Sequence, residues 1–283
     1  MPSQSLPTPI DTLFDGGAGR ALELPVRLAR LYGQLKMPAR GRRPYVFSNF
    51  VTSLDGVVSL QQAGHLGGSD ISGNNLQDRM VMGVLRAVAD VVMIGSGTLA
   101  ADPTHVWTAE GICPELAEDY RRLRHTLRKP ATPLNVVISG SGDLDLGLPV
   151  FASGRVRTLV LTTPVGAKRM AKRASASATT VLATRGSGAA ISPRSILRAL
   201  GQLCAGHRIL LEGGPRLLGD FYERRLVDEQ FLTLSPQILG RKSGDHRLSL
   251  VMDQLFAPGK GRWGRLTDVR RGASHLFLRY VFG

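Results

Sequence analysis

The sequence predicts an α/β fold in which a mainly parallel sheet is covered by helices on both faces. From Tyr45 onward, short apolar runs of strand length alternate with segments whose apolar residues recur at helical spacing. Strands that alternate with helices are typical of parallel sheets, because each parallel strand needs a crossover connection. The chain has 283 residues, 43% hydrophobic and 20% charged, which suffices for a large domain with a buried core.

The first elements follow from their apolar patterns. Tyr45–Thr52 predicts a strand, and Ser53–Gly56 predicts the turn that ends it. A helix is expected over Asn75–Ala89, because six of its apolar residues fall on one helical face. Val91–Ile94 follows this helix almost at once, as a buried strand does in a parallel sheet.

Two later helices are marked by proline in their first turn. Ser192 can act as the N-cap and Pro193 as the first residue before a helix over Ser195–Cys204. Pro215 is expected to have the same part before Arg216–Arg225. Six further strands are expected, of which the last could add antiparallel pairing: Asn135–Ile138, Thr158–Leu161, Thr180–Leu182, Arg208–Leu211, Gln230–Leu234 and His275–Phe282.

The first 40 residues differ in composition from the rest of the chain. They are rich in Pro, Gly and Arg and contain one plausible short helix, Leu24–Leu35. We expect residues 1–40 to form an N-terminal extension that is packed on the domain or partly mobile. No linker composition interrupts residues 41–283, so this stretch is expected to form one domain.

The expected compartment follows from what the sequence lacks. It does not open with a charged segment followed by an apolar run, and no apolar stretch is long enough to span a bilayer. Its two cysteines, Cys113 and Cys204, cannot build a disulfide framework and lack metal-ligand spacing. We therefore expect a cytoplasmic protein without membrane contact.

The formal net charge of +14 suggests a nucleic-acid partner. The charge is unevenly placed, since residues 1–120 carry 9 basic and 12 acidic side chains and residues 121–283 carry 27 and 10. A nucleic-acid groove would interleave aromatic with basic side chains. Trp263 is the only aromatic residue in the basic stretch Lys260–Arg271, so nucleic-acid binding without catalysis is the weaker hypothesis.

Two glycine-containing turns follow predicted strands. The amides of Gly95–Thr98 could approach a phosphate, although an ordinary tight turn is the better explanation of this segment taken alone. A Rossmann unit is not expected, because Pro103 would interrupt the long helix that this fold requires. Glu212–Pro215 offers close ligand approach beside a carboxylate, or a structural turn in which Glu212 caps nearby amides. Together the turns predict a ligand crevice at the carboxyl edge of the sheet.

Four motifs occur in a recognisable order along the chain. They are Ser53–Gly56, the helix end Leu85–Ala87, Val92–Thr98 with Asp102-Pro103, and Glu212–Leu218. In this order and spacing they resemble the reductase domain of bifunctional riboflavin biosynthesis proteins, which belongs to the dihydrofolate-reductase-like superfamily. The resemblance covers residues 44–283, most of the chain.

The resemblance implies a three-layer α/β/α dihydrofolate-reductase-like domain, usually a homodimer, that binds NADPH and needs no metal. Riboflavin-pathway members reduce the ribosyl group of a ribosylaminopyrimidinone phosphate to a ribityl chain. Hydride moves to C1 of the sugar through the ring-opened imine, and the protein supplies orientation and charge. A small-molecule pyrimidine is therefore the expected substrate, with dihydrofolate-type reduction of a pteridine as the alternative.

The resemblance also assigns site residues, position by position. Asp55, Asp102 and Glu212 match acidic positions near the reacting centre, where a carboxyl could protonate the imine nitrogen or orient sugar hydroxyls. Asp55 could instead only hold the turn at Gly56, and Asp102 could cap local amides. The positions that match or lie near cofactor contacts are Thr52, Gly95, Ser96, Gly97, Thr98, Ser139, Gly213, Gly214, Pro215, Arg216 and Leu217.

The chain departs from the family's pattern in places. No His-x-Glu motif and Cys-x-x-Cys pair of a zinc deaminase is present, so we expect a free-standing reductase. Many bacterial members have lysine where Asn49 stands, and a basic contact to the substrate phosphate near the position of His105. We expect Asn49, Ser53 and His105 to contact the substrate, with His105 as a partial substitute for that basic residue. The pyrimidine or pteridine could therefore differ from that of the parent pathway.

A basic segment follows the strand ending at Leu161. In the family's layout this segment lies near the adenosine end of the cofactor. Arginine binds phosphate through a planar fork of donors. One of four residues could thus contact the 2′-phosphate of NADPH: Lys168, Arg169, Lys172 or Arg173.

Overall fold

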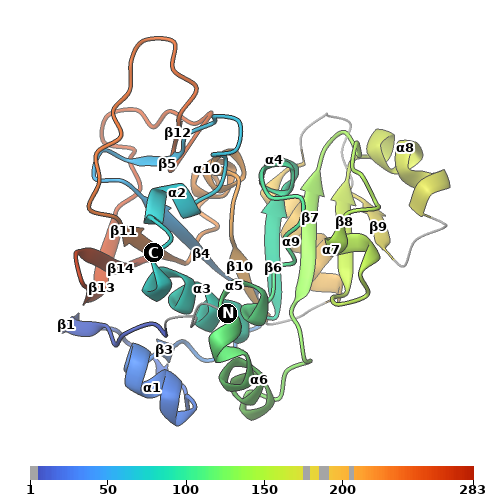
Figure 1. Cartoon of the computed structure of the whole chain (residues 1–283). Helices are drawn as coiled ribbons and strands as arrows, with labels where there is room; N and C mark the ends of the chain where they lie inside the picture. Colours follow the sequence, from blue (N-terminus) through green and yellow to red (C-terminus); the bar gives the residue numbers. More distant parts are fainter. Residues whose placement is uncertain (1–5, 175–178, 185–190, 204–206) are drawn as a thin grey trace.

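The computed structural model describes residues 6–174, 179–184, 191–203 and 207–283. In this part of the chain a ten-stranded mixed sheet has the order β1-β13-β14-β11-β4-β10-β6-β7-β8-β9 (Figure 1). Its strands, in chain order, are β1 Asp11–Asp15, β4 Tyr45–Thr52, β6 Val91–Gly95, β7 Leu134–Ser139, β8 Thr158–Thr162, β9 Thr180–Ala183, β10 Arg208–Leu211, β11 Glu229–Leu234, β13 Gly264–Gly272 and β14 His275–Phe282. Two small ribbons pair β2 Arg20–Ala21 with β3 Lys36–Met37, and β5 Val57–Ser59 with β12 Leu248–Ser249.

The strands from β11 to β9 in this order run parallel to one another. Their carboxyl ends therefore lie at the same edge of the sheet. In the register of the central strands, Leu211 of β10 lies opposite Ser48 of β4 and Met93 of β6. The prediction of a mainly parallel sheet is confirmed.

The other end of the sheet is antiparallel. β14 pairs with β11, β13 pairs with β14, and β1 pairs with β13. This arrangement confirms that the final aromatic strand adds antiparallel pairing. β13 was not expected from the sequence, because it comes from the charged stretch Lys260–Arg271. Within it Asp268 and Arg270 are buried and form an ion pair, so their charges neutralise each other inside the sheet.

Helices lie on both faces of the sheet and give three layers (Figure 1). One core cluster joins α1, α3, α5 and α6 to side chains such as Phe47 and Leu210, and the other joins α9 and α10 to Val46 and Ile209. None of the helices in the described ranges is long and apolar enough to cross a bilayer. The helices are α1 Val26–Tyr32, α2 Ser69–Ser72, α3 Leu76–Val88, α4 Ser96–Ala101, α5 Ala109–Ile112, the 3₁₀ helix Pro114–Leu116, α6 Ala117–Thr126, α7 Pro149–Ala152, α8 Pro164–Ala174, α9 Pro193–Leu203 and α10 Pro215–Glu223.

Local residues explain where several helices begin and end. α3 starts after Asn75, whose side-chain oxygen accepts a hydrogen bond from the Asp78 amide at 2.9 Å. α1 is shorter than the predicted Leu24–Leu35, because Pro25 precedes it in an extended conformation and Gly33, with φ of +85°, ends it. α4 is short, in agreement with the absence of a Rossmann helix. Cys204, the predicted end of α9, lies outside the described residues.

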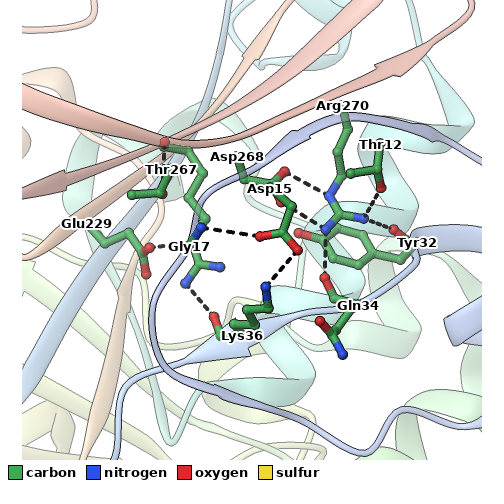
Figure 2. A network of polar contacts seen from close by, with 11 residues as sticks. Thr12, Asp15, Gly17, Tyr32, Gln34, Lys36, Glu229, Thr267, Asp268 and Arg270 are labelled. Atoms are coloured by element: carbon green, nitrogen blue, oxygen red, sulfur yellow. Dashed lines mark hydrogen bonds and ion pairs between the residues drawn. The ribbon is translucent and has the colours of Figure 1, made fainter.

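The described part of the N-terminal extension is packed on the domain. β1 forms one edge of the main sheet, and α1 lies against the core. Figure 2 shows polar contacts that hold this segment, among them those of the buried Arg270 and those of Asp15. Its guanidinium donates hydrogen bonds to Asp268, to the carbonyl oxygens of Tyr32 and Gln34, and to Thr12. A single arginine of β13 therefore fixes three places in the extension.

Candidate active site

The two glycine turns lie against each other at the carboxyl edge of the parallel strands. Gly213 has a φ of +119°, and a Cβ atom on it would lie 2.6 Å from the side chain of Thr98. Gly214 has a φ of +81°, and a Cβ atom there would lie 3.8 Å from the Cα atom of Gly95. Both positions thus favour glycine. The two turns thus lie together at the predicted edge of the sheet, and a ligand crevice there stays a prediction.

The first turn, Gly95–Thr98, presents backbone rather than side chains. Gly95 is the N-cap of α4, and within the described part of the chain no side chain caps that helix start. A Cβ atom on Gly95 or Gly97 would meet nothing within 4 Å. Amides at an uncapped helix start lack intrahelical partners and suit an anionic group such as a phosphate.

Glu212 is buried at the start of the second turn. Its Oε2 atom accepts a hydrogen bond from Nε of Arg86 at 2.7 Å. Its Oε1 atom is buried and makes no hydrogen bond to any described residue. Burial raises the pKa of Glu212, Arg86 opposes this shift, and the nearby carboxyl of Asp78 adds to it. The side chain therefore keeps a proton more readily than an exposed carboxyl does.

Arg86 is a site residue that the sequence did not reveal, although it lies in the motif Leu85–Ala87. It is buried in the last turn of α3, where a cation is favoured by the helix dipole. Besides Glu212, its guanidinium contacts Nε2 of His105 at 2.8 Å and the carbonyl oxygen of Thr108 at 3.0 Å. At helical spacing Arg86 falls away from the apolar face of α3 and beside Arg79, so its position in the sequence gives no signal, and its burial becomes apparent only in the structure.

His105 is neutral in this environment. Burial, together with Arg86, Arg79 and Arg155, lowers the pKa of His105 to about 3. Its Nδ1 atom lies 3.7 Å from Oδ2 of the exposed Asp102. His105 was expected to substitute for a basic residue that contacts the substrate phosphate. It carries no charge at neutral pH, so it can offer only a neutral hydrogen bond.

Asn49 lies beside Glu212 on the neighbouring strand. Leu211 is opposite Ser48, so the residues that follow them are level with each other. Asn49 and Val81 of α3 line the same small pocket, and Glu212 turns toward α3 to reach Arg86. Adjacent strands are about 4.8 Å apart, so a predicted substrate residue and a predicted acid occupy one face at one level.

Asp55 holds a turn. It accepts hydrogen bonds from Ser53 Oγ at 2.6 Å and from the amides of Leu239 and Gly240 at 3.2 and 2.7 Å. These donors lower the pKa of Asp55 to about 2, so it is ionised at neutral pH and carries no proton to donate. The same Ser53 hydroxyl accepts from the Val57 amide at 2.9 Å. The contacts match the alternative in which Asp55 fixes the connection after β4.

Two other predicted cofactor residues stand at strand ends with their hydroxyls engaged. Thr52, at the end of β4, donates to the carbonyl oxygen of Ser53 at 3.1 Å. Ser139, at the end of β7, accepts from the Gly142 amide at 3.2 Å. Both are buried, and both belong to the edge at which the glycine turns lie.

The first residues of α10 lie partly in the core and partly at the surface. Leu217 is buried in the core. The exposed Arg216 pairs with Asp253 at 2.7 Å, and the Pro215 carbonyl accepts from the Met252 amide.

On α8, Arg173 donates to carbonyl oxygens of the loop after β7, which distinguishes it from Lys168 and Arg169. The Lys172 side chain lies outside the described residues.

Comparison with known proteins gives one family match. Residues 44–252 match the model described as the RibD C-terminal domain. The 2,5-diamino-6-ribosylamino-4(3H)-pyrimidinone 5′-phosphate reductase of Archaeoglobus fulgidus is 26% identical over 198 residues, which cover 70% of this chain and 83% of that protein. The riboflavin biosynthesis protein RibD of Aquifex aeolicus is 24% identical over 243 residues, which cover 84% of this chain. The chain spans 58% of the length of that RibD.

A solved structure supports the fold. The pyrimidine reductase-like protein of Corynebacterium diphtheriae superimposes with a TM-score of 0.67 at 20% sequence identity. The match covers 90% of this chain and 98% of that one. At this identity the likeness establishes the dihydrofolate-reductase-like fold, while the activity has to be argued from the residues of the site.

Proposed function

The chain belongs to the RibD C-terminal domain family, and we propose that it is an NADPH-dependent pyrimidine reductase of riboflavin biosynthesis. The proposed reaction transfers hydride to the ribosyl C1 of a 5-amino-6-ribosylaminouracil phosphate or a related pyrimidine. The name of the relative from Archaeoglobus fulgidus supports this substrate class. The observation that carries the proposal is Glu212, a buried carboxyl with one free oxygen beside the two glycine turns.

The chain offers residues that fit a dinucleotide. The open backbone of Gly95 and Gly97 leaves room for a phosphate at the uncapped start of α4. We assign cofactor binding to this turn, to Gly213–Leu217 and to Thr52 and Ser139 at the adjoining strand ends. When bound, NADPH supplies the hydride that C1 receives. Its preference over NADH is assigned to a basic residue of α8, with Lys168 and Arg169 as the candidates not bonded to the neighbouring loop.

Glu212 is assigned as the proton donor. Reduction of the ring-opened imine adds hydride to C1 and a proton to the imine nitrogen, so the site needs an acid. Burial raises the pKa of Glu212 while Arg86 opposes the shift, so this carboxyl holds its proton more readily than an exposed one, as a proton donor requires. Asp102, exposed near His105, is assigned to orient the sugar hydroxyls, and Asp55 to hold the Ser53–Gly56 turn near the substrate.

The substrate contacts leave room for a second candidate. Asn49 stands level with Glu212 and can donate and accept hydrogen bonds at a heterocycle. His105 is neutral, so it provides no cation for a sugar phosphate. This favours a substrate whose phosphate contributes less to binding, and it keeps dihydrofolate-type reduction of a pteridine as the alternative.

We further propose a homodimer located in the cytoplasm. The family resemblance supports the dimer, and the free, buried thiol of Cys113 is compatible with a reducing compartment. Light scattering checks the mass of the particle in solution.

Nucleic-acid binding has less support. Arg208, Arg270 and Arg279 belong to the basic part of the chain, yet all three are buried. Arg270 and Arg279 are also paired with carboxylates, so part of the positive charge does not reach the surface. DNA or RNA affinity that falls steeply with salt would favour this alternative.

The decisive experiment measures thermal stability with NADPH or NADH, followed by NADPH oxidation with each substrate. Ligand at 100 times its Kd stabilises the native state by about 2.7 kcal/mol, so NADPH should raise the melting temperature clearly. A ribosylaminopyrimidinone phosphate should be turned over faster than dihydrofolate. If neither nicotinamide cofactor stabilises the protein, the proposed function is wrong.

A further inference from the structure

One guanidinium links the two side chains that face the proposed reaction. Nε of Arg86 donates to Oε2 of Glu212 at 2.7 Å, and Nη1 lies 2.8 Å from Nε2 of His105. Nη1 also donates to the Thr108 carbonyl oxygen at 3.0 Å. Arg86 and Glu212 have side-chain exposures of 3% and 5%, so water competes little for these contacts.

Thr108 makes this arrangement rigid. Its hydroxyl caps α5 by accepting from the Gly111 amide at 3.0 Å, while its carbonyl oxygen fixes the guanidinium. Arg86 itself projects from α3, a helix of 13 residues packed in the core. The guanidinium is therefore held between two helices and cannot turn without breaking several hydrogen bonds.

We propose that Arg86 is a positioning residue, which orients Glu212 with Oε1 toward the substrate and fixes His105 as the tautomer protonated on Nδ1. This inference rests on the proposed function for its catalytic meaning, while the arrangement itself can be tested without turnover. Arginine has only donors, so Nε2 of His105 must accept and the ring proton must reside on Nδ1. His105 then carries its N–H on Nδ1, the atom 3.7 Å from Oδ2 of Asp102, while Oε1 of Glu212 keeps no hydrogen bond to a described residue.

The chemistry needs the fork of an arginine. Nε and Nη1 point to different partners, and the single ammonium group of a lysine cannot replace both donors in this geometry. The positive charge also favours the ionised form of Glu212 and disfavours the protonated form of His105. Charged groups that face these two side chains are Arg86 and Asp78 at Glu212, and Arg86, Arg79, Arg155 and Asp102 at His105.

The first experiment is ¹⁵N NMR of His105 in the unaltered protein, with the signal assigned by a His105→Gln variant. We expect the Nδ1–H tautomer, and we expect the ring to stay neutral as the pH falls through the usual 6.5, because its pKa is lowered to about 3. Protonation on Nε2, or titration of His105 near the usual 6.5, would overturn the proposal whatever the activity. This measurement requires no variant of Arg86 to fold.

The second experiment compares Arg86→Gln and Arg86→Lys with Arg122→Gln, a control on the exposed face of α6. Arg86→Gln should lower kcat about 10- to 100-fold, because a displaced acid reacts slowly. Removing the charge should also raise the pKa of Glu212, so the fall of kcat at high pH should begin at a higher pH. Arg86→Lys should keep the original pH profile but not the full rate, and Arg122→Gln should change neither.

Two outcomes separate this inference from the proposed function. A merely structural role for Arg86 would lower the rate at every pH without moving the profile, which would overturn the inference. Absence of NADPH-induced stabilisation in the unaltered protein would instead overturn the proposed function. The His105 tautomer would still decide whether Arg86 orients the pair.

Discussion

Gly213 lies so close to Thr98 that a single added carbon would stand 2.6 Å from the threonine side chain. The two residues belong to turns 115 positions apart in sequence, one after β6 and one after β10. Their contact sets the distance between the proposed cofactor turn and the turn that carries Glu212.

Replacing Gly213 by alanine should weaken both turns. The backbone φ of +119° is unfavourable for any residue with a Cβ atom, and the new methyl group would displace Thr98. We expect a loss of about 1–3 kcal/mol in the free energy of unfolding and weaker NADPH binding. Denaturant unfolding and cofactor titration measure the two effects. Gly97→Ala is the matched control, because open space surrounds Gly97; it should weaken NADPH binding with little change in stability.

Glu212→Gln should separate chemistry from binding. The amide keeps the size of the side chain but has no acidic proton, so we expect kcat to fall about 10²- to 10⁴-fold. Because Arg86 would lose a buried anionic partner, stability should also fall, by about 3–5 kcal/mol. Saturation kinetics and chemical denaturation measure these changes. Unchanged kcat would show that another group donates the proton.

Asp55 should make stability depend on pH in the acid range. Its folded-state pKa, about 2, lies below the usual 3.8 of an aspartate, so its contribution is present above pH 3.8 and is lost as the pH falls through 2. Asp55→Asn should therefore lower the melting temperature at pH 7, and the difference from the unaltered protein should shrink toward pH 2. A difference that stays constant with pH would contradict the hydrogen bonds assigned to this carboxylate.

Arg270→Ala should release the N-terminal segment from the sheet. The substitution removes hydrogen bonds to Thr12, Tyr32 and Gln34 and leaves the buried Asp268 unpaired, at a cost of about 3–5 kcal/mol. Hydrogen exchange should become faster in residues 11–37. Arg271→Ala is the neighbouring control: its pair with Asp11 is more than half exposed, so it should cost less than about 1 kcal/mol. Equal effects of the two variants would contradict the central position of Arg270.

The elements predicted from the sequence are those with strong periodicity. β4, α3, β6 and β10 were expected within one or two residues, because each is an apolar run or a one-sided helix between clear turn residues. The glycine turns could be predicted to meet because the carboxyl ends of parallel strands share an edge. These signals are local, because each apolar pattern or turn residue by itself indicates the backbone conformation of its own segment.

The elements and contacts that could not be predicted from the sequence depend on residues far apart along the chain. β13 has the composition of a charged loop, and only the pairing of Asp268 with Arg270 shows why it can be a strand inside the structure. β1 is exposed along its whole length and is a strand through its pairing with β13. Arg86 could be placed on its helix, but its contacts with Glu212 and His105 follow from tertiary packing.

The pairing of β1 with β13 also bears on how the chain acquires its fold. Asp11 and Arg271, which face each other in this pair, are 260 positions apart. Contacts of such large sequence separation form late, because a long loop must close before they contribute. During synthesis β1 leaves the ribosome before β13 and has no partner until β13 has followed it. A nascent chain that stops before residue 264 would therefore keep its first strand unpaired and open to other proteins, including chaperones.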